Sequence, residues 1–102
     1  EFIYVDDVSE AIIKFLDNKK LIKKNIYWLN IGSGYDLNIN NLAKKIAKII
    51  GYKGKFFNNL SKPDGQKKKL LDVSLSKKLK WYPKYSLEDG LKKTIHWYKI
   101  NR

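Results

Sequence analysis

Apolar residues recur at helical spacing near the start of the chain. They fall on one face of a helix that opens after two adjacent carboxylates, and they are Val8, Ala11, Ile12, Phe15 and Leu16. We predict Asp7 as the N-cap, with Glu10 three residues later completing a capping box. The alternative is that Asp6 and Asp7 work as an acid–base pair, although no His or further acid is placed to work with them.

The same spacing predicts three more helices. One covers residues 39–50, with Asn38 as its N-cap and Gly51 as its stop, and its stripe is Ile39, Leu42, Ala43, Ile46, Ile49 and Ile50. Ser86 forms a capping box with Asp89 at the start of a late helix, whose stripe is Leu87, Leu91, Ile95 and Tyr98. Between these two, Ser74 is expected to cap a short helix that runs through Leu79.

Other segments have the composition of short strands. Residues 26–31 are rich in aromatic and β-branched side chains, residues 53–57 are a second candidate, and residues 70–73 form a brief extended or helix-entry piece. About four helices with two or three short strands predict a small α/β or α+β domain. The 102 residues are enough for one such domain, so we expect a single domain over residues 1–102.

The formal net charge of +12 raises the possibility of a nucleic-acid-binding module. Arg occurs only at Arg102, however, so 21 of the 22 basic residues are Lys. Because Arg supplies most bidentate recognition of bases and phosphates, this composition argues against specific readout. We expect only weak, salt-sensitive binding of polyanions, and we keep the basic module as an alternative.

Several classes of site lack their residues. There is no Cys and a single His, His96, so neither a metal site nor a Ser-His-Asp or Cys-His catalytic set can be assembled. We therefore expect no metal and no catalytic residue in this chain. No apolar run approaches ~18 residues and no signal-peptide pattern opens the sequence, so we expect a cytoplasmic protein without a membrane segment.

The turn Gly32-Ser33-Gly34 lies between a predicted strand and a predicted helix, as in dinucleotide-binding folds. The third glycine of that fingerprint is replaced by Leu37, and no acidic residue follows at ~20 positions in a second strand. We expect no cofactor-binding residue in this chain.

A second turn carries candidate binding chemistry. In Ser61-Lys62-Pro63-Asp64-Gly65, the proline fixes φ and the glycine can take a positive φ, so the turn is well defined. Asp64 and Lys69 lie close in sequence on this loop, where binding residues concentrate. Their pairing suits a ligand with a hydroxylated part and an anionic part, such as a sugar nucleotide. Alternatively, Asp64 only stabilises the turn.

The whole chain resembles the C-terminal region of GDP-L-fucose synthases, whose pattern at this turn is SKPDGTPRKLLDV. This chain has SKPDG at 61–65 and KLLDV at 69–73, and it differs at Gln66, Lys67 and Lys68. EFIYVDDVSEAI at 1–12 is similar to EFLHVDDLAEA, and NIGSG at 30–34 matches the NVGTG or NIGSG turn. LAKKIAKIIGYKG at 42–54 and SLEDGL at 86–91 resemble LAELIAEVVGFKG and SLEEGL, and Trp81 and Pro83 correspond to LGW…P.

The resemblance implies the C-terminal substrate-binding region of an extended short-chain reductase. In that family an N-terminal Rossmann domain holds NADP(H) and the catalytic Ser, Tyr and Lys, with a Cys and a His for epimerisation. None of these residues is in this chain, so we expect a piece of a longer, homodimeric enzyme that is inactive alone and binds no cofactor itself. The family converts GDP-4-keto-6-deoxy-D-mannose to GDP-L-fucose with NADPH.

Carried over by motif, Asp64 and Lys69 are the substrate-contacting positions. The resemblance places Lys69 at the diphosphate or sugar and Asp64 at a hydroxyl. Lys67 and Lys68 replace Pro-Arg, which makes the loop less rigid. The family's substrate Arg would immediately precede Glu1. A region of another NAD(P)-dependent nucleotide-sugar epimerase or dehydratase remains the alternative.

Overall fold

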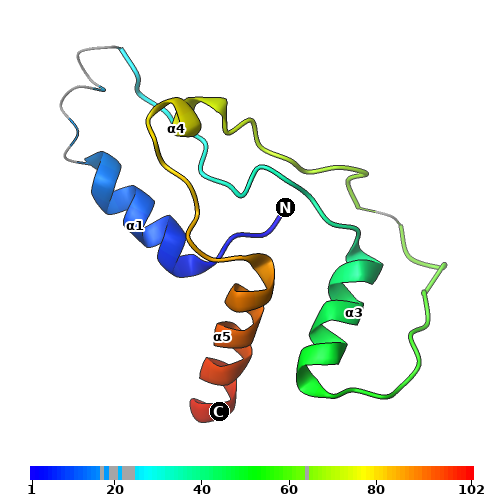
Figure 1. Cartoon of the computed structure of the whole chain (residues 1–102). Helices are drawn as coiled ribbons and strands as arrows, with labels where there is room; N and C mark the ends of the chain where they lie inside the picture. The colour runs from blue at the N-terminus through cyan, green and yellow to red at the C-terminus, as the bar shows by residue number, and fades with distance from the viewer. Residues whose placement is uncertain (17, 19–20, 22–24, 64) are drawn as a thin grey trace.

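The computed structural model describes residues 1–16, 18, 21, 25–63 and 65–102. Four helices are described: α1 (Val5–Leu16), α3 (Ile39–Ile50), α4 (Ser74–Lys78) and α5 (Leu87–Ile100). The first residues run through the middle of the molecule, with α1 on one side and α3 on the other (Figure 1). Helix α5 packs on α3, and a long loop leaves the end of α3 and returns to α4.

The predicted strands are wrong for the part of the chain that the structure describes. Residues 26–31 and 53–57 have no strand pairing there, so the described fold is helical and not α/β. Residues 70–73 lead directly into α4, as the helix-entry alternative predicted. A strand needs a neighbour whose backbone N–H and C=O groups bond to its own. Residues 26–31 have suitable side chains but no such neighbour among the described residues. Tyr27 and Trp28 are left 76% and 74% exposed.

Two predicted N-caps are confirmed, whereas the one predicted at Ser74 is wrong, because Ser74 is the first residue of α4 and Val73 holds the cap position. The Asn38 side chain accepts a hydrogen bond from the Asn40 N–H at 2.8 Å, and Ser86 Oγ accepts one from the Asp89 N–H at 3.1 Å. At the other end of α3, Gly51 adopts φ +73°, and the Tyr52 N–H reaches back to the Ala47 carbonyl. Such a positive φ favours glycine, which explains why the helix ends there.

The N-cap predicted at Asp7 is wrong, because α1 begins earlier, at Val5. Asp7 is 1% exposed, and its carboxylate accepts hydrogen bonds from the Lys84 N–H at 2.8 Å and the Tyr85 N–H at 3.2 Å. It satisfies two backbone donors of a segment 77 residues away instead of the first turn of its own helix.

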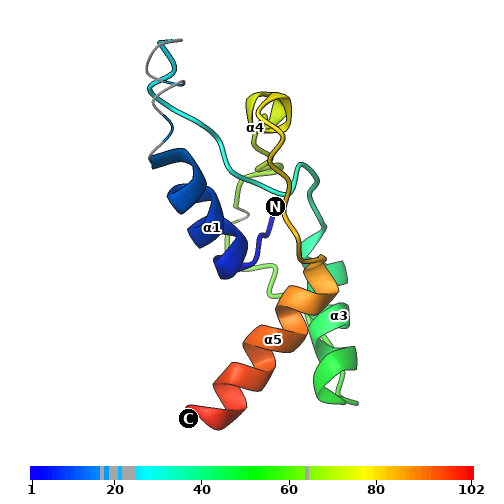
Figure 2. The ribbon, with the colours of Figure 1, turned by 60° about the vertical axis from the view of Figure 1, so that its left-hand side comes forward.

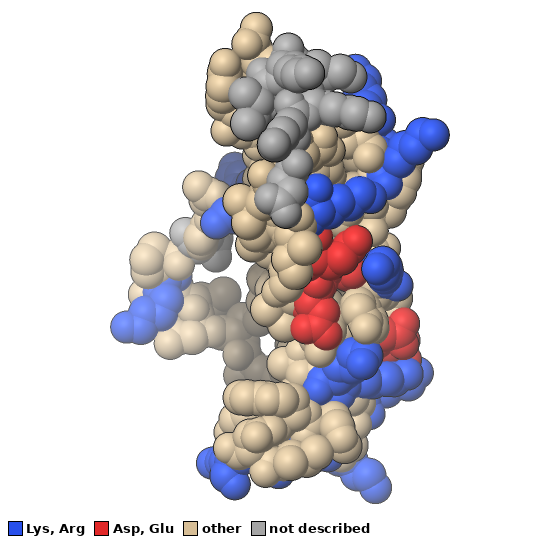
Figure 3. All heavy atoms as spheres, turned by 90° about the vertical axis from the view of Figure 1, so that its left-hand side faces the viewer, with Lys and Arg blue, Asp and Glu red and all other residues tan. Residues whose placement is uncertain are grey.

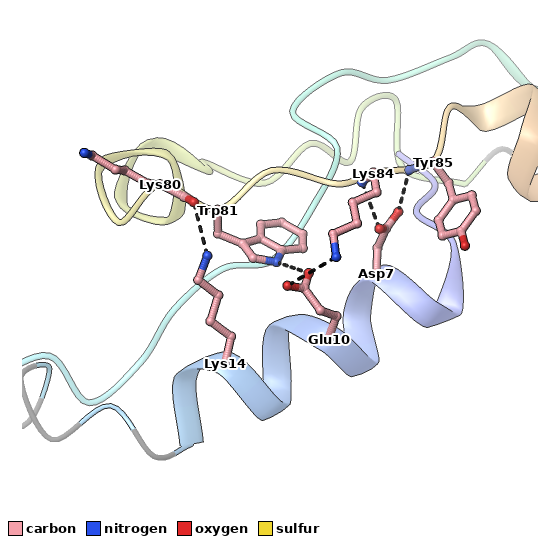
Figure 4. A network of polar contacts seen from close by, with 7 residues as sticks. All are labelled: Asp7, Glu10, Lys14, Lys80, Trp81, Lys84 and Tyr85. Atoms are coloured by element: carbon pink, nitrogen blue, oxygen red, sulfur yellow. Dashed lines mark hydrogen bonds and ion pairs between the residues drawn. The ribbon is translucent and has the colours of Figure 1, made fainter.

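Helix α4 ends in a turn that directs Trp81 toward α1. Lys80 adopts φ +57°. Its N–H donates to the Lys77 carbonyl at 2.9 Å, and the Trp81 N–H donates to the Ser76 carbonyl at 3.0 Å. This pair of bonds is the Schellman arrangement that closes a helix C-terminus. Trp81 is 2% exposed, and its indole N–H donates to Glu10 Oε2 at 3.0 Å (Figure 4).

These contacts form the α1 anchor, which we define as Asp7, Glu10, Lys14, Lys80, Trp81, Lys84 and Tyr85. Lys14 donates to the Lys80 carbonyl at 3.2 Å, and the Lys84 ammonium lies 3.7 Å from Glu10 Oε1. On the face that carries α1, acidic side chains gather in the middle with lysines around them (Figure 3). The anchor therefore ties α1 to the chain between α4 and α5.

The molecule as a whole is not compact. The radius of gyration is 17.1 Å, whereas a compact domain of this length has about 13 Å. Helix α1, helix α3 and the long loop lie apart from one another in both ribbon views (Figure 1 and Figure 2). Few apolar side chains of the described residues are buried, namely Ala11, Leu21, Ala47, Val73 and Trp81. None of the described helices is long and apolar enough to cross a membrane.

Candidate functional site

An open hollow of about 1050 Å³ lies between the first residues, the start of α3 and the returning loop. One side of it is lined by residues 1–3, 31–32 and 36–40, and the other by residues 57–60, Lys62, residues 66–69 and Leu71. The hollow is large enough for a ligand of the size of a sugar nucleotide.

Lysines dominate the loop side of this hollow. Four of them line it, namely Lys62, Lys67, Lys68 and Lys69, and all four are exposed. Exposed ammonium groups clustered on one wall attract a polyanion such as a diphosphate, with a strength that falls as salt increases. The structure thus places the predicted Lys69 at the wall of a hollow, beside the two lysines at which the sequence departs from the family. Asp64, the other predicted residue, lies outside the described residues.

The glycine turn at 32–34 packs against its neighbours on both sides. A Cβ on Gly32 would lie 2.5 Å from Glu1 Oε1, and Gly34, at φ +82°, approaches Val73. The Gly34 N–H donates to Glu1 Oε1 at 2.7 Å. A phosphate-binding glycine loop offers its N–H groups to the ligand, but here the Gly34 N–H is bonded to a carboxylate. Close packing of the backbone accounts for these glycines.

Glu1 is a residue that the sequence analysis missed. Its carboxylate also accepts hydrogen bonds from Ser33 Oγ at 3.2 Å and from the Leu71 N–H at 2.9 Å. It therefore joins the glycine turn to the segment that follows Lys69. No spacing rule could have identified it, because its partners are 32 to 70 residues away.

Two smaller hollows have a different character. One of about 290 Å³ lies between α1 and residues 26–31, and one of about 260 Å³ lies between the first residues, α3 and α5. Among the described residues, the lining of both hollows is mostly apolar and includes no Lys or Arg. Within the described residues, no group of three or more His, Cys, Asp or Glu could hold a metal ion.

No protein-family model matches this chain. Several curated proteins, however, are similar to it. The chain is 41% identical over its whole length to a GDP-L-fucose synthase of Escherichia coli, of which the match covers 33%. It is 39% identical over 99% of its length to a putative GDP-L-fucose synthase of Arabidopsis thaliana and over 96% to a GDP-L-colitose synthase of Yersinia pseudotuberculosis. The chain thus spans about a third of the length of the curated relatives that it matches.

Two solved structures from Campylobacter jejuni share the fold. A GDP-6-OMe-4-keto-L-xylo-heptose reductase superposes on the whole chain with a TM-score of 0.87 at 35% identity, over 31% of its own length. A GDP-mannoheptose C4 reductase with NADP bound covers 91% of the chain with a TM-score of 0.68 at 36% identity, over 28% of its own length. With the motifs at 1–12, 30–34 and 61–73 and a match along its full length, the chain is similar to the C-terminal part of GDP-L-fucose synthases.

Proposed function

We propose that this chain is the part of an NADP-dependent GDP-sugar reductase that binds the sugar nucleotide. The observation that supports this most directly is the lysine-lined hollow of about 1050 Å³, because it combines room for the ligand with a cationic wall. The relatives and the structural neighbours are all named for GDP-sugars, which supports the same ligand class.

In this proposal Lys69 contacts the diphosphate or the sugar, and Asp64, by its motif alone, contacts a hydroxyl group. These residues bind and position the substrate. The cofactor NADP(H) and the proton-transfer groups belong to the rest of the enzyme, so the 102-residue chain holds the substrate without carrying out the reaction. Catalysis then depends on how accurately this region places the sugar against the nicotinamide. Oxidation of NADPH by the isolated chain in the presence of a GDP-4-keto sugar would contradict this division of labour.

Two sugars are candidates. The curated relatives favour GDP-4-keto-6-deoxy-D-mannose, the substrate that the family resemblance implies. The two solved structures favour a GDP-linked heptose, since both are named as reductases of such sugars. The ratio of kcat/KM for the two keto sugars, measured on an enzyme of the relatives' length that contains this chain, decides between them.

Lys69→Ala in that enzyme tests the proposed site. An ammonium–phosphate contact that is partly screened by solvent contributes ~1–3 kcal/mol, so KM should rise about tenfold or more. The contact exists in both the ground state and the transition state, so kcat should change much less.

Lys68→Ala is the matched control, since it removes an identical charge from the same wall at a position where the family pattern differs. We expect it to raise KM less than about threefold, the effect of a screened surface charge. Steady-state kinetics in which Lys67 or Lys68 matters more than Lys69 would contradict the assignment of Lys69.

A further inference from the structure

The Glu1 carboxylate makes three hydrogen bonds to two segments of the chain. Oε1 accepts from the Gly34 N–H at 2.7 Å and from Ser33 Oγ at 3.2 Å, while Oε2 accepts from the Leu71 N–H at 2.9 Å. Leu71 is two residues beyond Lys69. One carboxylate therefore bridges the glycine turn and the end of the lysine-rich loop.

A second contact holds the two segments together. Asn30 Nδ2 donates to the Asp72 carbonyl at 3.1 Å, and Asp72 Oδ1 accepts from the Ser74 N–H at 2.9 Å, at the start of α4. The chain is thus fixed from Leu71 onward. Residues 66–69 precede this fixed segment and are exposed along the wall of the hollow. Lys69 lies where the exposed loop joins the fixed segment.

The chemistry of Glu1 favours a positioning role over direct contact with the ligand. Burial acts to raise the pKa of its carboxyl group, but the hydrogen bonds from Leu71, Gly34 and Ser33 hold the pKa below the ordinary value. The group is therefore an anion at neutral pH. Glu1 lines the hollow, but its anion would repel a diphosphate, whereas its bonds to the two backbone N–H groups are charge-assisted and strong.

We propose that Glu1 is a positioning residue for the sugar-nucleotide site. Its carboxylate holds the backbone at Leu71 against the glycine turn, and this sets where the Lys69 ammonium meets the anionic part of the ligand. The inference rests on the proposed function, since it assigns Glu1 a role in the binding that Lys69 performs there.

Glu1→Gln in the enzyme of the relatives' length is the first test. An amide group has one oxygen and one NH₂ group, so either the Gly34 N–H or the Leu71 N–H faces a donor whichever way the side chain turns. We expect KM for the GDP-sugar to rise about tenfold with kcat little changed. Glu88→Gln is the matched control, because it removes the same charge from an exposed ion pair with Lys92 on α5, and it should leave KM unchanged.

A double-mutant cycle separates positioning from general loss of structure. If Glu1 acts through Lys69, Glu1→Gln should raise KM less than about twofold when Lys69→Ala is already present. Gly32→Ala disturbs the hydrogen bond between Glu1 and Gly34 without changing Glu1, because the new Cβ would lie 2.5 Å from Glu1 Oε1. It should reproduce the rise in KM, and it provides the test if Glu1→Gln does not fold.

The outcomes are distinguishable. Binding that depends on Lys69 but is unaffected by Glu1→Gln overturns the positioning role and leaves the proposed function standing. Equal effects of Glu1→Gln with and without Lys69 also overturn it, because Glu1 would then act independently of Lys69. Titration calorimetry that detects no saturable binding of GDP to the unmodified enzyme overturns the proposed function and this inference together.

Discussion

The α1 anchor and the lysine-lined hollow are built from opposite kinds of polar contact. In the anchor, a carboxylate that is 1% exposed satisfies two backbone N–H groups, and an indole that is 2% exposed donates to a second carboxylate. In the hollow, four lysines on an irregular loop are exposed to solvent. The first region uses its charges to fix the backbone, whereas the second keeps its charges accessible.

This difference explains how one small chain can hold a scaffold and a proposed binding surface. A buried carboxylate must be fully hydrogen-bonded, so it tolerates few changes. Exposed lysines contribute little to stability, so their number and order can vary while the long-range attraction for an anion is kept. The departures from the family pattern at Gln66, Lys67 and Lys68 lie in the exposed region.

The largest effect that we expect comes from Trp81→Ala. Deleting a buried Trp removes its packing and leaves a cavity, which costs about 4 kcal/mol of unfolding free energy. Urea denaturation followed by circular dichroism measures the loss. Trp81→Phe, which keeps most of the volume and loses only the N–H bond to Glu10, should cost much less. Equal losses for the two variants would mean that the hydrogen bond matters more than the packing.

Asp7→Ala should follow, with a loss of about 3 kcal/mol, because the N–H groups of Lys84 and Tyr85 lose their acceptors in a buried place. The same denaturation experiment applies. Asp6→Ala is the matched control, since Asp6 is the exposed neighbour on the same turn of α1. If the two substitutions had the same effect, Asp7 would be acting as a surface charge and the anchor would not be the fixed region described above.

A smaller change of opposite sign is expected for Lys80→Gly. Lys80 adopts φ +57° at the end of α4, where a residue with a Cβ is strained and glycine is favoured. Relief of the strain, less the entropy that glycine adds to the unfolded chain, should stabilise the protein by about 0.5–1 kcal/mol. The rise in the denaturation midpoint measures this. A lower denaturation midpoint would contradict the backbone strain that we assign to Lys80.

The helices were predictable because their signals are local. The caps at Asn38 and Ser86 and the stop at Gly51 depend on groups within four residues of the helix end, which the sequence displays directly. The strand prediction at residues 26–31 failed because pairing is not local: composition shows that a segment suits a sheet and not whether a partner lies beside it. Asp7 was misassigned for the same reason, since a carboxylate before a helix caps it by default and only the fold brings Lys84 and Tyr85 to it.

For the candidate site, the sequence by itself supplied the residues on which the proposed ligand chemistry rests. It supplied the lysines, the turn at 61–65 and the resemblance that singles out Asp64 and Lys69. Only the tertiary structure decided that the lysines share a wall with the glycine turn, and that Glu1 holds that turn to Leu71 across 70 positions of sequence. Side-chain chemistry is a property of each residue, whereas a bridging carboxylate exists only once the chain has brought its two donors together.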